Sequence, residues 1–390
     1  MISTAAALAH LFDLVSPLPI EMVSLRHAAG RTLAQDLHAS RDQPPFAASA
    51  MDGYALRDAD VTTGATLRVI GEAAAGHRFN GTITAGTAAR IFTGAPLPHG
   101  ADRVIIQEDV SRHGDHITLH TDIDPARYVR PAGADFKTGD TIPAPRLITP
   151  SDVALIAAMN IAMVPVTRKP VVAIIATGDE LVQPGEVPRP DQIIASNSYG
   201  LAALIDASGG HARLLPIARD TVPALELAFD LAASADLIIT IGGASVGDHD
   251  LVDQVALAKG MDRSFYKVAM RPGKPLMAGK INGTPMMGLP GNPVSAMVCG
   301  HIFMLPILRK MLGHGQAAAT RHSAKLMHPL GANGGREHYM RARLNADGLH
   351  VFERQDSALL TVLAEANCLA IRPPHDGARL PGEVLEIIHI

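Results

Sequence analysis

Between residues 170 and 313, short and almost purely apolar runs alternate with longer stretches of helical pattern. The apolar runs are VVAIIA, ARLLPIA, DLIITI and PMMGL, and the segments between them include SNSYGLAALIDASG and VPALELAFDLAASA. A strand that is apolar at every position must be covered on both faces, which is typical of parallel sheets flanked by helices. The pattern therefore predicts a central three-layer α/β/α domain with a mostly parallel sheet over residues 170–316.

The part of the chain that precedes this domain follows two other patterns. Residues 41–140 contain short strands broken by Gly, Pro and Asp, which predicts a small β-rich inserted domain. Residues 1–40 and 141–169 are expected to form one discontinuous N-terminal linker domain around it. Its first helix is predicted to be amphipathic and capped near Ser3 or Thr4, and its second to be capped at Ser151.

The tail of the chain, residues 317–390, returns to strand-like segments such as HYMRARLN and EVLEIIHI. These segments predict a C-terminal β-barrel-like domain. A chain of 390 residues exceeds what one compact core usually holds. The predicted fold class is therefore multidomain α/β plus β.

Composition excludes several classes of function. The formal net charge is −4 and there is no Trp, so neither nucleic acid nor a base-stacking platform is expected. Cys299 and Cys368 lie far apart without a metal-binding spacing, which argues against a disulfide framework and suits a reducing compartment. No apolar run approaches the roughly 20 residues that span a bilayer, and no membrane contact is expected. The predicted location is cytoplasmic.

Three of the predicted parallel strands end in unusual loops. VVAIIA leads into ATGDEL, DLIITI into GGASVGDHD, and PMMGL into PGNPVSA. Ligands of parallel sheets collect outside the carboxyl ends of the strands, so the three loops are expected to share one binding edge. Glu180 in the first loop is a candidate metal ligand or acid–base group, and Asn292 with Ser295 in the third belongs to a helix start suited to anions.

The stretch DLIITIGGASVGDHDLV, residues 236–252, allows two interpretations. Gly242, Gly243 and Gly247 would let backbone N–H groups approach an anion, to which Ser245 adds a hydroxyl. Asp250 supplies hard oxygen suited to Mg²⁺. A glycine-rich turn that caps the next helix explains the stretch equally well, and the stretch alone leaves both open.

The segment YKVAMRPGKPL carries Lys267, Arg271 and Lys274. Two prolines and a glycine prevent a helix here, so the three cations are expected on a stiff loop. Cations concentrated in an acidic protein favour a bound phosphate or oxyanion over a merely solvated loop. From the residues alone, the chain is predicted to bind a phosphorylated anionic ligand with Mg²⁺.

Seven motifs in one order resemble the molybdopterin molybdenumtransferase family, the MoeA type that includes the E domain of gephyrin. They are PPFAASAMDGYAL, IFTGAPLPHGADRVIIQED, GADFKTGD, ATGDEL, GGASVGDHD, VAMRPGKPL and GLPGNPVSA, over roughly residues 40–300. The tail matches more loosely through QDSALLTVLAEANCLAIRP. The resemblance implies that the central domain is of the molybdopterin-binding type.

The resemblance also implies a reaction. Such enzymes cleave adenylylated molybdopterin in a Mg²⁺-dependent step, load molybdate onto the dithiolene, and release AMP and molybdenum cofactor. Chemistry of this kind depends on positioning and charge neutralisation. The expected substrates are adenylylated molybdopterin and molybdate, and the expected further partners are a molybdopterin adenylyltransferase and apo-molybdoenzymes.

The family pattern assigns roles to residues in three groups. The expected catalytic residues are Asp52, Asp135, Asp220, Lys267 and Arg271. The expected metal ligands are Glu180, Asp250 and Asp52. The expected substrate contacts are Thr93, Gly242, Gly243, Ser245, Gly247, Lys274, Asn292, Ser295, Arg341 and Ser357. Asp52, Thr93 and Asp135 can each also be explained as turn residues, and Asp220 as the N-cap of the helix after it.

The family is dimeric, and its cleft combines the α/β domain of one subunit with the small β domain of the other. This implies a homodimer here, with Asp52 and Asp135 supplied across the subunit boundary. Ala358 and Cys368 stand where the family commonly has glycine, which bears on the role of Ser357.

Two other functions compete with the insertase. A molybdopterin adenylyltransferase has a similar α/β domain, but the additional β domains and the motif order favour the insertase. A gephyrin-like scaffold would need no catalytic set, and a pure binding module would be free to lose Asp52 or Lys267.

Overall fold

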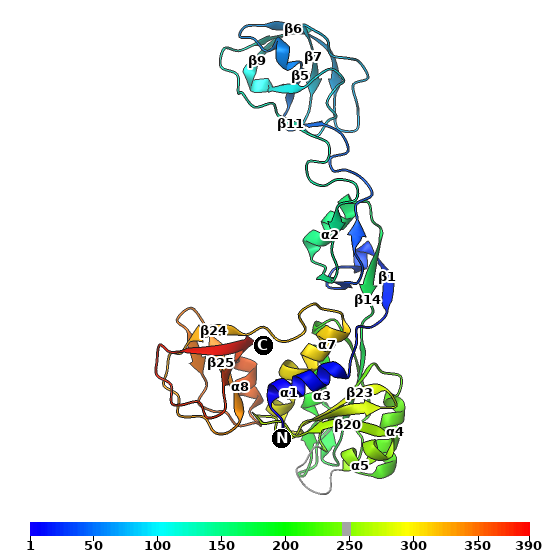
Figure 1. Ribbon diagram of the computed structural model, residues 1–390, viewed down its shortest axis with the longest axis vertical. Helices are drawn as coiled ribbons and strands as arrows, with labels where there is room; N and C mark the ends of the chain where they lie inside the picture. The colour runs from blue at the N-terminus through cyan, green and yellow to red at the C-terminus, as the bar shows by residue number, and fades with distance from the viewer. Residues whose placement is uncertain (244–250) are drawn as a thin grey trace.

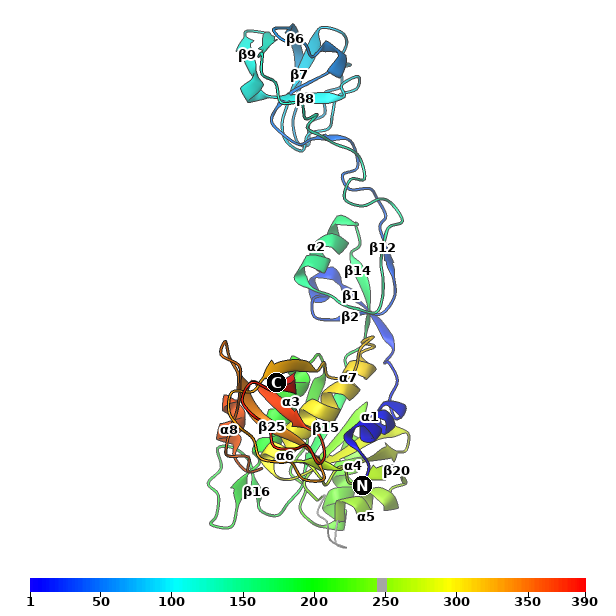
Figure 2. The same cartoon turned by 60° about the vertical axis from the view of Figure 1, so that its left-hand side comes forward.

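The protein is elongated, with a central α/β unit and a C-terminal β unit at one end and a β-rich unit at the other (Figure 1). A small linker unit lies between them, and a view turned by 60° shows the same separation (Figure 2). The computed structural model describes residues 1–243 and 251–390. The predicted multidomain α/β plus β architecture is therefore present.

A six-stranded sheet forms the middle of the central unit, in the order β18-β15-β19-β23-β22-β20. β15 pairs in parallel with β18 and β19, and β19 with β23, whereas β22 and β20 add an antiparallel edge. The strands are β15 (Val171–Ala176), β18 (His211–Leu214), β19 (Leu237–Ile241), β20 (Met261–Tyr266), β22 (Met277–Ile281) and β23 (Thr284–Leu289). The predicted mostly parallel sheet is confirmed.

Helices cover both faces of this sheet, because its inner strands are apolar on both sides. β19, for example, is buried at all five positions. One core joins the sheet to α1, α3, α6 and α7, and a second joins it to α4 and α5. The helices are α1 (Thr4–Asp13), α3 (Ser196–Ala207), α4 (Val222–Ala232), α5 (Leu251–Ala258), α6 (Pro293–Cys299) and α7 (Leu305–Met311).

The continuous helical stretch Pro293–Met311 joins α6 and α7 through a π-helical turn at Gly300–Met304. By length and composition it is the one candidate membrane span among the described residues, and 78% of it is buried inside the molecule. Its apolar side chains belong to the core beneath the sheet.

The first helix packs on the central unit. Ser3 caps α1 by accepting a hydrogen bond from the Ala6 N–H at 3.1 Å, as the sequence predicts. Ala7, Leu11 and Val15 are buried in the same core as β15 and β19. Although the sequence pattern places residues 1–40 with the linker, α1 is part of the central core.

The linker unit brings two distant parts of the chain into one sheet, in the order β1-β14-β2-β13. Its helix is capped by Thr149 and not by Ser151, because the Thr149 side chain accepts from the Asp152 N–H and the Asp152 carboxylate accepts in return. The elements are β1 (Ile20–Ser24), β2 (Thr32–Leu33), β3 (Leu37–His38), β12 (Thr141–Ile142), β13 (Arg146–Leu147), α2 (Pro150–Ala158) and β14 (Met163–Thr167).

The β-rich unit is a six-stranded sheet in the order β8-β5-β7-β6-β10-β9, with β4 and β11 paired beside it. Two small apolar cores fill it. The strands are β4 (Ala48–Ser49), β5 (Gly53–Leu56), β6 (Thr66–Ala73), β7 (Thr87–Ile91), β8 (Arg103–Ile106), β9 (Val110–His113), β10 (His116–Leu119) and β11 (Val129–Arg130).

The C-terminal unit pairs its strands in the order β21-β25-β27-β28-β24, with β26 on β25. β24 continues into Leu326, which forms a parallel bridge with Leu349 of β26, and the Met327 N–H donates to the Leu349 carbonyl at 3.0 Å. Because β26 pairs with β25, the strands return to β24, in agreement with the predicted barrel-like domain. β21 (Met270–Arg271) comes from the central unit and pairs in parallel with β25. The other elements are β24 (His322–Lys325), β25 (Glu337–Leu344), β26 (Leu349–Val351), α8 (Leu360–Glu365), β27 (Cys368–Arg372) and β28 (Val384–His389).

Candidate functional site

A cavity of about 940 Å³ opens where β15, β19 and β23 end. The three strands are parallel neighbours, so their carboxyl ends meet at one edge, as the sequence predicts. The predicted residues that line the cavity are Glu180, Asp220, Gly242, Gly243 and Asn292. The volume is in the range of sites for small molecules and cofactors.

Gly242 allows two of these loops to approach each other closely. Its φ is +93°, in the left-handed region that favours glycine. A Cβ at this position would lie 2.7 Å from the Thr177 carbonyl oxygen, so a larger residue would force the loops apart. Part of the predicted anion cradle is thus built from close backbone contacts. Ser245, Gly247 and Asp250 lie outside the described residues.

Asp220 faces the cavity among other carboxylates. Its burial, together with the negative charges of Asp179 and Glu180, raises the pKa of Asp220 above its ordinary value. The Asp220 N–H donates to the Asp179 carboxylate at 3.3 Å. The N-cap of α4 is Thr221, so the alternative explanation of Asp220 as the helix cap is wrong.

The carboxylates suit a divalent cation, because Mg²⁺ prefers oxygen ligands and would relieve the repulsion that raises the Asp220 pKa. Within residues 1–243 and 251–390, no three His, Cys, Asp or Glu side chains are grouped to hold a metal on their own. Glu180 and Asp220 therefore form at most part of a ligand set.

Several polar cavity residues escaped the motif-based prediction, and two of them are Ser196 and Asn197. Both open α3, and the Asn197 side-chain amide donates to the Gly291 carbonyl at 2.7 Å, joining two strand-end loops. The signal for them was a Ser-Asn-Ser helix start after a short apolar pair, which is too common to single out. Leu181, Ile193 and Ile194 add apolar surface to the cavity lining.

The cationic loop adjoins the cavity through Pro275, which lies on its wall. Lys267, Arg271 and Lys274 are not among the lining residues. The loop is not helical, as predicted: Lys267 has a φ of +72°, and Arg271 lies in β21, which pairs in parallel with β25.

Arg341 is fully buried, although the sequence marked it only as a tail position. Its two terminal nitrogens donate to the backbone carbonyls of Asp356 at 3.0 Å and Arg354 at 3.1 Å, and its Nε has no partner. Burial lowers the pKa of Arg341, and the negative charge of Asp356 offsets only part of this effect. Burial and the positive charge of Arg271 lower the pKa of His338 to about 4. A buried guanidinium whose hydrogen bonds are to backbone carbonyls favours an anion nearby.

The start of α6 is bound to the tail. Asn292 occupies the predicted N-cap position, but its side chain does not cap; its amide donates to the Ser357 hydroxyl at 3.1 Å. Ala358, the residue after Ser357, lines the cavity. Ser295, a predicted substrate contact, is 4% exposed and is not among the residues that line the cavity.

Asp52, Thr93 and Asp135 lie away from this cavity. Asp52 precedes β5 in the β-rich unit, at the far end of the molecule (Figure 1). Its carboxylate accepts from the Thr93 N–H at 2.7 Å and hydroxyl at 2.8 Å, and these bonds hold its pKa below the ordinary value. Asp135 is exposed on a separate loop. One chain therefore does not bring the predicted acidic set together.

Comparison with known proteins covers nearly the whole chain. Residues 2–160 match the family "MoeA N-terminal region (domain I and II)". Residues 173–310 match "Probable molybdopterin binding domain", and residues 323–390 match "MoeA C-terminal region (domain IV)".

Full-length relatives agree with these matches. The molybdopterin molybdenumtransferase of Nostoc sp. is 37% identical over 383 residues, covering 93% of this chain and 88% of that protein. The Haemophilus influenzae protein of the same name is 34% identical over 386 residues, covering 97% and 95%. A crystal structure of the molybdopterin biosynthesis MoeA protein from Pyrococcus horikoshii superposes with a TM-score of 0.88 at 30% identity, covering 100% of this chain and 99% of that one. The chain belongs to the molybdopterin molybdenumtransferase family.

Proposed function

We propose that this protein is a molybdenum insertase, which cleaves adenylylated molybdopterin with Mg²⁺ and transfers molybdate to the dithiolene, releasing AMP and molybdenum cofactor. The observation that carries the proposal is the convergence of three parallel strand ends on one cavity that holds Glu180, Asp220 and Gly242. An adenylylated pterin needs such a cavity, with carboxylates for a metal and backbone close enough to hold phosphate.

The acidic residues are assigned to Mg²⁺ and the basic residues to the anionic groups of the substrates. Glu180 and Asp250 would hold Mg²⁺ together with Asp52, and Mg²⁺ would neutralise charge on the phosphates. Lys267 and Arg271 bind the phosphates or molybdate, and the buried Arg341 with Ser357 serves the oxyanion. Asp220, whose raised pKa favours a bound proton or a nearby cation, and Asp135 complete the acidic set.

The complete site is shared between two copies of the chain. The β-rich unit stands away from the central unit of its own chain, which holds the cavity, and this supports the arrangement (Figure 2). In a homodimer, Asp52, Thr93 and Asp135 of one subunit would reach the cavity of the other. The proposed setting is the cytoplasm, which suits the free, buried Cys299 and Cys368. There a molybdopterin adenylyltransferase would supply the substrate and apo-molybdoenzymes would accept the product.

The test is AMP release from adenylylated molybdopterin with Mg²⁺, measured with and without molybdate. We expect molybdate-dependent release by the wild type and a sharp loss in Asp52→Ala. Asp42→Ala is the matched control, because Asp42 accepts from the Thr138 N–H and hydroxyl in the same geometry, both at 2.8 Å, and has no assigned role.

The same experiment separates the two competing functions. An adenylyltransferase would consume ATP when plain molybdopterin is supplied and would not need molybdate. A scaffold would show neither activity.

A further inference from the structure

Lys267 has a backbone conformation that is unusual for a residue other than glycine. Its φ of +72° lies in the left-handed region, which costs energy for a residue with a Cβ and persists only where neighbours impose it. Part of this constraint is local. The Lys267 N–H donates to the Leu276 carbonyl at 2.9 Å, and the Val268 N–H donates to the Lys274 carbonyl at 3.0 Å, so the cationic loop closes on itself.

The second constraint comes from the N-terminal segment. Ile2 forms a parallel bridge with Val268. The Ile2 N–H donates to the Lys267 carbonyl at 3.3 Å, and the Ala269 N–H donates to the Ile2 carbonyl at 2.8 Å. The Ile2 side chain packs on the central core, which anchors this short strand.

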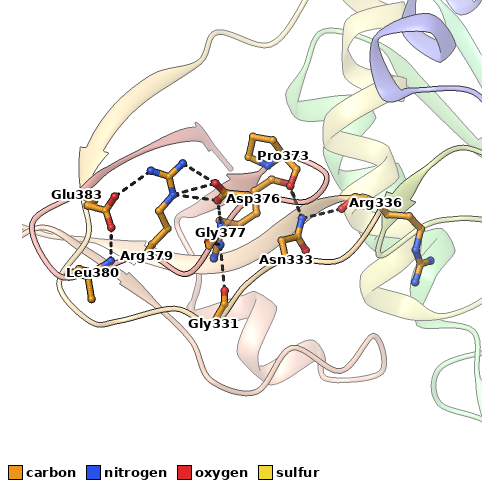
Figure 3. Close-up of polar contacts among 10 residues, drawn as sticks. Gly331, Asn333, Arg336, Pro373, Asp376, Gly377, Arg379, Leu380 and Glu383 are labelled. Atoms are coloured by element: carbon orange, nitrogen blue, oxygen red, sulfur yellow. Dashed lines mark hydrogen bonds and ion pairs between the residues drawn. The ribbon is translucent and has the colours of Figure 1, made fainter.

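On the opposite edge, the C-terminal unit holds the same segment. The Glu337 N–H donates to the Ala269 carbonyl at 3.1 Å, and the Arg336 guanidinium donates to the Met270 carbonyl at 3.4 Å. The Asn333 amide in turn donates to the Arg336 carbonyl at 2.9 Å (Figure 3). The backbone from Lys267 to Met270 is therefore fixed between Ile2 on one side and β25 on the other.

The ammonium group of Lys267 has its own support. Lys267 Nζ lies 4.8 Å from the centroid of the Tyr266 ring, within the range of a cation–π contact. This contact directs a flexible side chain that otherwise samples many rotamers. Backbone and ammonium are thus both fixed before any ligand arrives.

We propose that Ile2 and Tyr266 are positioning residues that preset Lys267 for an oxyanion or phosphate ligand. The inference rests on the proposed function, in which Lys267 binds the phosphates or molybdate. A preset cation loses less conformational entropy when the ligand binds, so the two residues raise affinity without touching the ligand.

The backbone support is tested with Ile2→Gln, which disfavours packing on the core without adding charge, against Ile2→Leu, which keeps the packing. Molybdate and AMP are the probes, and their dissociation constants are measured by titration calorimetry. We expect Ile2→Gln to weaken binding about two- to tenfold, the effect of freeing one long side chain. Hydrogen exchange at the Ala269 amide should quicken in the same variant while the melting temperature stays near the wild-type value. Faster exchange with unchanged affinity for both probes would overturn the role of Ile2.

The side-chain support is tested with Tyr266→Leu against Tyr266→Phe. Loss of the ring should weaken binding about two- to fivefold, and Phe should restore it, because the ring face and not the hydroxyl makes the contact. Equal binding by Leu and Phe would overturn the role of Tyr266.

AMP release distinguishes this inference from the proposed function. If the variants bind the probes more weakly but the wild type releases no AMP, the positioning role is supported and the insertase function is rejected. If the wild type releases AMP and the variants equal it in affinity and KM, only the positioning role is rejected. If the wild type binds neither molybdate nor AMP, both the positioning role and the insertase function are rejected.

Discussion

The carboxylate of Asp52 shows how one side chain is prepared for a charged role. Two donors from Thr93, its N–H and its hydroxyl, converge on a single carboxylate oxygen. Both stabilise the ionised form and so lower the pKa of Asp52, although the group is exposed. An ionised carboxylate is the form that a metal ligand requires.

Replacing Thr93 should therefore change the pH dependence of the reaction. Thr93→Val removes the hydroxyl donor and raises the pKa of Asp52. Because Asp52 then protonates at higher pH, the loss of AMP release on acidification should begin at higher pH than in the wild type. Thr93→Ser keeps the hydroxyl and should leave this acid limb in place. An unshifted acid limb in Thr93→Val, measured from initial rates across pH, would contradict the assignment.

The loops after β15 and β19 depend on a contact that side chains would prevent. Gly242 lies against the Thr177 carbonyl and has a positive φ. Gly291, in the third loop of the same cavity, has a negative φ, and a Cβ there would lie 3.6 Å from the nearest atom, the Cα of Gly242. The two glycines thus offer a matched pair of positions in one site.

We expect Gly242→Ala to cost about 1–3 kcal/mol of local strain and to raise KM for adenylylated molybdopterin, because the two loops must separate. Gly291→Ala should be tolerated much better in both respects. Steady-state kinetics with parallel thermal unfolding would check both, and equal behaviour of the two variants would argue against the close-contact explanation.

The loop between β27 and β28 is held by buried charge. Arg372 and Asp376 form an ion pair whose side chains are 2% and 7% exposed, and Arg372 also donates to the Gly377 carbonyl at 2.6 Å. Arg379 reaches Asp376 at 2.6 Å and Glu383 at 3.2 Å (Figure 3). This network is joined to Arg336 through Asn333, whose side-chain amide donates to the carbonyls of both Arg372 and Arg336.

Removing one partner of that buried pair leaves a charge without compensation. Asp376→Ala should lower the free energy of unfolding by about 3–5 kcal/mol. Glu365→Ala, which breaks an exposed pair with Arg343 in the same unit, should cost less than about 1 kcal/mol. Denaturant unfolding of both variants measures the difference, and a small loss in Asp376→Ala would show that the pair contributes little.

The shape of the whole molecule separates the two halves of the proposed site. Asp52 belongs to the β-rich unit at one end, and the cavity with Asp220 belongs to the central unit at the other (Figure 1). A site built from both needs two chains, and a closed dimer would contain two such sites.

Mixing two inactive variants tests this arrangement. When Asp52→Ala and Asp220→Ala subunits exchange freely, about half of the dimers are mixed, and each mixed dimer has one cleft with both residues intact. AMP release should recover to about a quarter of the wild-type rate. No recovery, despite subunit exchange demonstrated by native mass spectrometry, would place both residues in one chain's site or in separate functions.

Much of the fold followed from local pattern. The apolar runs at β15, β19 and β23 predicted a covered parallel sheet, and parallel strands bring their carboxyl ends to one edge by geometry alone. The family motifs then indicated which residues of the three loops to examine. These features depend on periodicity and on residues that are close in sequence.

Contacts between distant segments could not be derived in this way. The pairing of β21 with β25 and the bridge between Ile2 and Val268 beside Lys267 each join parts of the chain more than 60 residues apart. No local pattern encodes such contacts, because they arise from how whole units pack. The sequence thus specified the sheet, its loops and the chemistry available there, while packing between units set how the cations are held and which acidic residues one chain can bring to the cavity.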